Sequence, residues 1–128
     1  MESLVTQGIK ITVTNFYQEH ISDPLAGEYV FAYRVRIENG SEESIKLLTR
    51  HWTILESTGV KRIVEGEGVR GIQPWIPVGH THEYASWCRL QTEMGRMGGY
   101  YVMHRESDGV RFRVHVPNFQ MLAPMKLN

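Results

Sequence analysis

Apolar side chains recur at every second position along most of this chain. Between residues 9 and 17, Ile9, Ile11 and Val13 alternate with polar side chains, and the same alternation returns in residues 29–37. A two-residue period gives a β-strand one buried face, and no stretch has the spacing of an amphipathic helix. The sequence therefore predicts an all-β protein.

Turn-forming residues divide the chain into about seven short strands. Asn39-Gly40, Ser57-Thr58-Gly59 and Ser107-Asp108-Gly109 each follow an alternating stretch, while Pro74 and Pro77 mark an irregular crossing. Seven antiparallel strands in one domain, residues 1–128, pack economically as a two-sheet sandwich. The expected strands are residues 9–17, 28–39, 45–56, 60–65, 80–90, 100–104 and 110–116.

Charge, cysteine content and hydropathy limit the partners and the compartment expected for this protein. The 14 Lys and Arg residues balance the 14 Asp and Glu residues, so the chain has no net field that would attract nucleic acid. Cys88 is the single cysteine, which excludes an intrachain disulfide, and the first residues lack a secretory leader. No apolar run reaches the length of a membrane helix. We expect a cytoplasmic protein with no nucleic-acid partner, no membrane insertion and no cofactor.

Four groups of residues, in their order and spacing, resemble the ApaG family. They are Tyr29 to Tyr33, Arg50-His51-Trp52, residues 66–74 and the stretch from Gly109 to Phe119. The resemblance covers about residues 9–122 and implies an immunoglobulin/fibronectin type III-like antiparallel β-sandwich. It also implies small bacterial relatives associated with cobalt resistance and magnesium efflux, without a settled biochemical activity. Val78-Gly79 and Trp87 depart from the family pattern.

A glycine-rich segment, Gly66-Glu67-Gly68-Val69-Arg70-Gly71, is the candidate ligand-binding or partner-binding loop. Its spacing matches the dinucleotide-binding fingerprint, but Pro74 and Pro77 prevent the helix that such a site requires. Acidic residues on both sides of Gly66 also disfavour phosphate. We interpret the glycines as allowing positive φ and a close crossing between sheets. An anion-binding nest in this loop is the alternative.

His80 and His82 are candidate metal ligands. Alternate residues on a strand project from one face about 7 Å apart, close enough to share a cation. A third ligand would have to come from His104, His115 or Glu83, and the sequence around His80 is typical of an exposed strand start. We expect exposed histidines and no metal site.

Arg50-His51-Trp52 lies in the middle of a predicted strand. A tryptophan at such a position usually fills the core between two sheets, so we expect Trp52 to be buried and Arg50 to pair with an acid such as Glu65. Cys88 and Ser86 lack the spacing of a nucleophile and its base, and Cys88 is interpreted as a small buried side chain. The sequence therefore favours a binding module over an enzyme.

The predicted function is a non-enzymatic module whose glycine loop and sheet edge bind another protein. The alternative is a protein of cation homeostasis that binds a small molecule, pyrophosphate or a divalent metal. A homodimer is also predicted through strand 9–17, which is expected to lie at a sheet edge. Lys10 is the only charge there that could prevent edge pairing.

Overall fold

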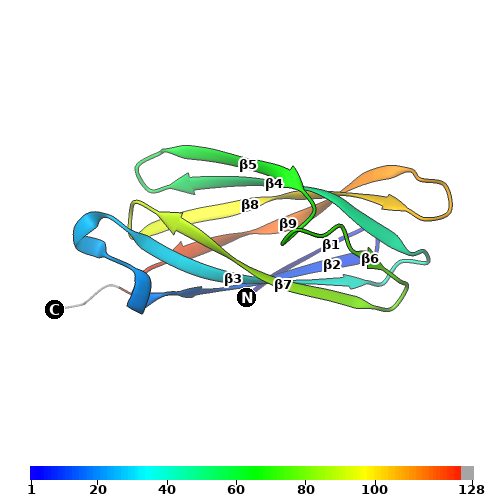
Figure 1. The fold of residues 1–128 in the computed structure, drawn as a ribbon, viewed down its shortest axis with the longest axis horizontal. Coiled ribbons are helices and arrows are strands. Elements are labelled where there is room, and N and C mark those ends of the chain that lie inside the picture. Colours follow the sequence, from blue (N-terminus) through cyan, green and yellow to red (C-terminus); the bar gives the residue numbers. More distant parts are fainter. Residues whose placement is uncertain (125–128) are drawn as a thin grey trace.

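The computed structural model describes residues 1–124, which form two antiparallel sheets packed face to face (Figure 1). Two short 3-10 turns, Glu19–Ile21 and Pro24–Ala26, are the only helical segments in this range. The predicted all-β sandwich is therefore confirmed. The strands are β1 (Glu2–Thr6), β2 (Ile9–Tyr17), β3 (Tyr29–Asn39), β4 (Ile45–Glu56), β5 (Lys61–Glu67), β6 (Trp75–Ile76), β7 (Thr81–Leu90), β8 (Met94–Arg105) and β9 (Arg111–Leu122).

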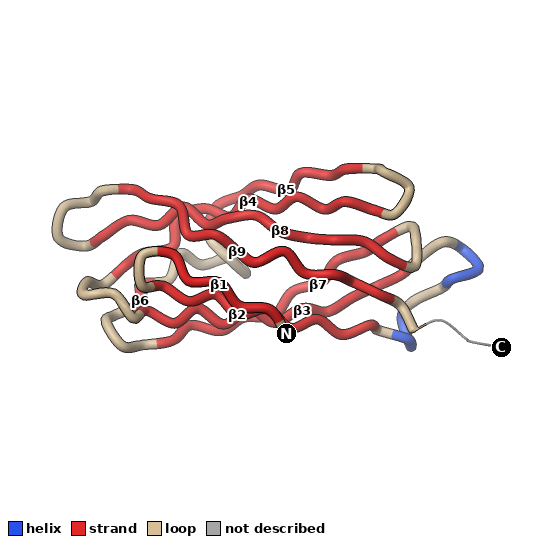
Figure 2. The backbone as a smooth tube through the Cα atoms, turned by 180° about the vertical axis from the view of Figure 1, so that it is seen from behind, coloured by secondary structure: helices blue, strands red, loops and turns tan. Residues whose placement is uncertain are grey.

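One sheet has the strand order β1-β2-β3-β7 and the other β5-β4-β8-β9, with the short β6 paired to β4. Strands β1 and β2 both contact β9, so this side of the sandwich is closed, as Figure 2 shows from behind. On the opposite side lie β5 and β7, the last strand of each sheet. No helix in residues 1–124 is long and apolar enough to cross a membrane.

Alternation along the strands fills the core, as the sequence predicts. Phe31, Val35 and Ile37 of β3 are fully buried, and they face inward side chains of β4, β8 and β9. Trp52 is 3% exposed and packs edge-on against Tyr33, Tyr101 and Phe119. The expectation that Trp52 fills the core is therefore confirmed.

Three expectations about the strands are wrong. Strand β2 is not at an edge, because β1 pairs along it from Glu2 opposite Val13 to Thr6 opposite Ile9. Strand β8 begins at Met94 rather than at residue 100, because its glycines lie inside the strand. Gly98 and Gly99 sit at a bulge, where a Cβ on Gly99 would lie 1.9 Å from the carbonyl oxygen of His51. Strand β9 continues past Pro117 to Leu122.

Candidate functional site

The glycine-rich segment is the end of β5 followed by a tight turn against β4. The amide of Gly68 donates to the carbonyl of Leu48, while Val69 and Ile72 donate to each other's carbonyls. Gly68 and Gly71 have φ of +62° and +82°, and Arg70 between them has φ of +50°. Three amides of the turn are thus used within the protein, and no helix follows, so the geometry differs from that of a phosphate-binding loop.

Gly66 lies within β5, where its missing side chain makes room for Arg50. A Cβ on Gly66 would lie 2.8 Å from the Nη1 and Nη2 atoms of Arg50. The Nη1 atom of Arg50 donates to the carbonyl oxygens of Glu67 and Gly68, at 2.9 and 3.1 Å. The Arg50 side chain therefore holds the beginning of the turn in place by binding the backbone of the turn.

The expected pair between Arg50 and Glu65 does not form. The Glu65 carboxylate lies 3.4 Å from Nδ1 of His51, on the outer face of the sheet, because Glu65 and His51 are register partners on that face. Arg50 and Trp52 have the opposite parity and face the interior. The inward position of Arg50 in an otherwise apolar alternation is the sequence feature that could have indicated this site.

A cleft of about 210 Å³ opens beside Arg50, between the two free strands β5 and β7. We call it the β5–β7 cleft. Its walls include three arginines, a serine hydroxyl and a thiol, and no carboxylate belongs to the lining. The lining residues are Tyr33, Arg50, Trp52, Ile54, Arg62, Val64, Ser86, Trp87, Cys88, Arg89 and Met97.

The groups in the β5–β7 cleft are hydrogen-bond donors rather than nucleophiles. Burial raises the pKa of Cys88, so its thiol stays protonated at neutral pH. Burial also raises the pKa of Tyr33, whose hydroxyl therefore remains a donor. The Arg62 guanidinium donates to the carbonyl of Arg89 and so connects β5 to β7 across the cleft. This arrangement can bind an acceptor, but it contains no activated nucleophile.

Tyrosine hydroxyls continue this polar lining into the core. The hydroxyl groups of Tyr84 and Tyr101 are hydrogen-bonded to each other between the sheets. Burial raises the pKa of both, and the positive charge of Arg50 partly opposes the shift. Both phenols are therefore neutral at physiological pH, and Arg50 has no tyrosinate as its counter-ion.

Alternate residues of β5 direct their backbone groups away from β4. The amide of Glu56 donates to the carbonyl of Val60, and that of Gly68 to the carbonyl of Leu48. Because hydrogen-bonded pairs alternate in an antiparallel ladder, these two bonds place residues 62, 64 and 66 in the bonded positions. The N–H and C=O groups of Lys61, Ile63 and Glu65 then point to the free edge, where no strand within residues 1–124 pairs with β5.

The two candidate metal ligands have different environments. His80 is exposed and precedes β7, whereas His82 is half-buried in β7 on the side that faces the core. Burial lowers the pKa of His82, and its Nε2 has no hydrogen-bond partner. No group of three or more His, Cys, Asp or Glu side chains within the described chain could hold a metal ion.

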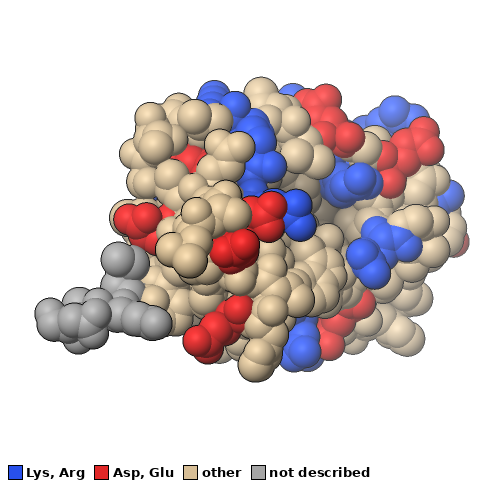
Figure 3. Space-filling view, turned by 60° about the vertical axis from the view of Figure 1, so that its left-hand side comes forward, with Lys and Arg blue, Asp and Glu red and all other residues tan. Residues whose placement is uncertain are grey.

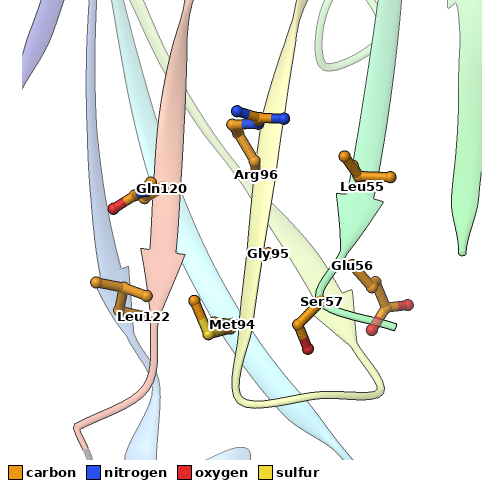
Figure 4. A pocket seen from close by; sticks show the side chains of 8 residues that line it. All are labelled: Leu55, Glu56, Ser57, Met94, Gly95, Arg96, Gln120 and Leu122. Atoms are coloured by element: carbon orange, nitrogen blue, oxygen red, sulfur yellow. The ribbon is translucent and has the colours of Figure 1, made fainter. Parts of the chain in front are cut away.

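A second hollow on the surface has a lining that does not converge. The hollow in Figure 4 lies over the ends of β4, β8 and β9, where Arg96, Gln120 and Leu122 spread apart rather than converge. Lys and Arg side chains are interspersed with Asp and Glu over the face shown in Figure 3. The β5–β7 cleft is therefore the site with the most distinctive chemistry.

Comparisons with known proteins agree with this architecture. A family model described as the ApaG domain matches residues 19–105. Proteins named ApaG from Brucella canis and Sinorhizobium fredii are each 42% identical over 124 residues, which cover 97% of this chain and 95% of theirs. The crystal structure of the putative ApaA protein from Bordetella pertussis aligns with a TM-score of 0.88 at 37% identity, over 92% of this chain and 95% of that one. A protein from Archaeoglobus fulgidus, at 11% identity and a TM-score of 0.54, shares the fold.

Proposed function

The chain belongs to the ApaG domain family, and from this premise we propose that it is a non-enzymatic module that binds an extended segment of another protein along β5. The observation that carries the proposal is the free edge of β5. Lys61, Ile63 and Glu65 offer unpaired backbone groups there, and an added strand can satisfy them in register. The glycine turn ends this edge and fixes its length.

Side chains along β5 add apolar and charged contacts to those of the backbone. Ile63 is 63% exposed and Val64 is 39% exposed, so both provide apolar contact area. Lys61 and Arg62 carry positive charges at the start of the strand, and Glu65 carries a negative charge near its end. Charged residues on an edge strand prevent indiscriminate pairing, so a bound segment needs complementary charges.

The substitution Ile63→Pro tests the proposal, because proline removes an N–H group that faces the free edge and leaves the ladder with β4 intact. Ile63→Thr is the matched control, since it removes the apolar side chain but keeps the N–H group. Peptides of eight residues, selected on the wild-type chain from a displayed library, serve as the probe. We expect Ile63→Pro to weaken their binding at least tenfold more than Ile63→Thr does.

Amide hydrogen exchange provides a second readout that needs no variant. In the free chain, the amides of Ile63 and Glu65 should exchange faster than those of Arg62 and Val64, and a bound peptide should slow the first pair. Unchanged affinity in Ile63→Pro, or protection confined to another part of the chain, would overturn the proposal. Thermal melting of both variants shows whether they are folded.

A further inference from the structure

Arg50 is a charge on the inner face of β4 without a charged partner. Its side chain is half-buried, and only Nη1 has acceptors, the two backbone carbonyls of Glu67 and Gly68. Among residues 1–124, no carboxylate lies within salt-bridge distance of Arg50, and its Nε and Nη2 atoms have no hydrogen-bond partner. These two nitrogens are not among the buried polar atoms of the described chain, so they are open to solvent and can donate to a ligand in the cleft.

Trp52 has a buried donor without a partner. Its side chain is almost fully buried, and the indole Nε1 has no acceptor in the described part of the protein. Trp52 and Arg50 are two residues apart on one face of β4, and both line the β5–β7 cleft. The Nε1 atom is shielded from solvent, so Trp52 lies beside Arg50 as a reporter of what occupies the cleft rather than as a donor to it.

We propose that the β5–β7 cleft binds a carboxylate at Arg50, beside Trp52. The site deepens the proposed function and rests on it in one respect, namely that the carboxylate belongs to the segment bound along β5. Gly66 provides the geometric connection. Because the Arg50 guanidinium occupies the space of the missing Gly66 side chain, it reaches under β5 toward the free edge. An inward side chain of an added strand can therefore meet it.

Shape and the chemistry of a bound segment favour a carboxylate over the other anions. The Nε and Nη2 atoms of Arg50 are its free donors, since Nη1 holds the turn. A carboxylate carries one negative charge, and its two oxygens match the planar donor edge of a guanidinium. Pyrophosphate is not part of a polypeptide segment, and the three arginines of the lining make it the competing ligand that the test has to separate. The arginines also exclude a cation from this cleft.

Matched peptides test the proposal directly. The probes are acetylated, amidated seven-residue peptides of alternating Val and Thr with one central Glu, and their twins with Gln in its place. A third peptide has the carboxylate at its C-terminus instead. We expect the Glu peptide to bind at least tenfold more tightly than the Gln twin and to shift the NMR resonance of the Trp52 indole N–H. The third peptide shows whether a terminal carboxylate serves equally.

Substitutions separate the carboxylate from the rest of the bound segment. Arg50→Lys keeps the charge but loses the planar donor edge, so it should lower the affinity for the Glu peptide at least tenfold and leave that for the Gln twin within twofold. Arg34→Lys, on the exposed outer face of β3, is the control and should change neither affinity. Thermal melting of the Arg50 variant checks that the glycine turn remains folded.

The outcomes distinguish this site from the strand-binding function. Equal affinity for the Glu and Gln peptides would overturn the carboxylate site and leave strand addition intact. Acetate that shifts the Trp52 indole resonance in the wild-type chain but not in Arg50→Lys would support the site even if no peptide bound. Pyrophosphate that binds more tightly than the Glu peptide and depends on Arg50 would overturn the proposed ligand class.

Discussion

At the scale of single residues, the three glycines of the loop are needed for three different reasons. Gly66 accommodates the Arg50 guanidinium. Gly68 has a positive φ, and a Cβ added to it would lie 2.1 Å from the carbonyl oxygen of Ile72. Gly71 has a positive φ but open space around it. The interpretation of the glycines as residues that allow positive φ is thus confirmed for Gly68 and Gly71 and is wrong for Gly66.

This difference gives a prediction about stability. Gly71→Ala should lower the free energy of unfolding by about 1 kcal/mol, the cost of a left-handed conformation for alanine. Gly68→Ala adds a clash with backbone and should cost about 3 kcal/mol. Urea denaturation of both variants measures the difference. Equal losses would mean that the turn relaxes freely around Gly68.

His82 makes stability depend on pH. Burial lowers its pKa in the folded chain, so the unfolded chain binds the proton first as the pH falls. The contribution of His82 to stability is therefore fully present above about pH 6.5, the value for an unperturbed histidine, and is lost as the pH falls toward the folded pKa. His82→Gln should lose less stability than the wild type between pH 7.5 and pH 5 in urea denaturation. The exposed His80→Gln is the control and should follow the wild type.

At the scale of elements, β1 covers one edge of β2. The sequence predicts a homodimer through residues 9–17, but β1 already pairs with the edge of β2 that such a dimer would use. Removal of residues 2–6 should expose that edge, where Lys10 is the single charge, and raise the mass measured by light scattering as concentration increases. Ser3→Ala, which removes only a 3.0 Å hydroxyl contact with Thr12, is the control. An unchanged mass after the deletion would show that β2 is not prone to pairing.

Several elements could be predicted because their residues alternate. Strands β2 and β3 match their expected ranges to within one residue, and their inward side chains are the expected ones. Strand β1 was missed because most of its residues are exposed, so Leu4 and Val5 give no one-sided pattern. The start of β8 was missed because Gly95, Gly98 and Gly99 indicate turns unless a bulge needs them.

At the scale of the whole molecule, the two sheets meet closely on one side and leave the β5–β7 cleft on the other. Burial of Trp52 and Cys88 could be predicted from the sequence, since each follows from one side chain and its strand. The cleft could not be predicted from the sequence. It depends on which strands end each sheet and on the register that places Gly66 opposite Arg50, and neither is encoded in a local pattern.

The position of β9 in the closed side of the sandwich has a consequence for biosynthesis. Strands β1 and β2 leave the ribosome before β9, the strand they pack against, has been translated. The fully buried Val114 and Met121 of β9 complete the same core as Ile9 and Ile11. A nascent chain must therefore carry its apolar N-terminal strands without their partner until β9 has been translated, and only then can the sandwich close.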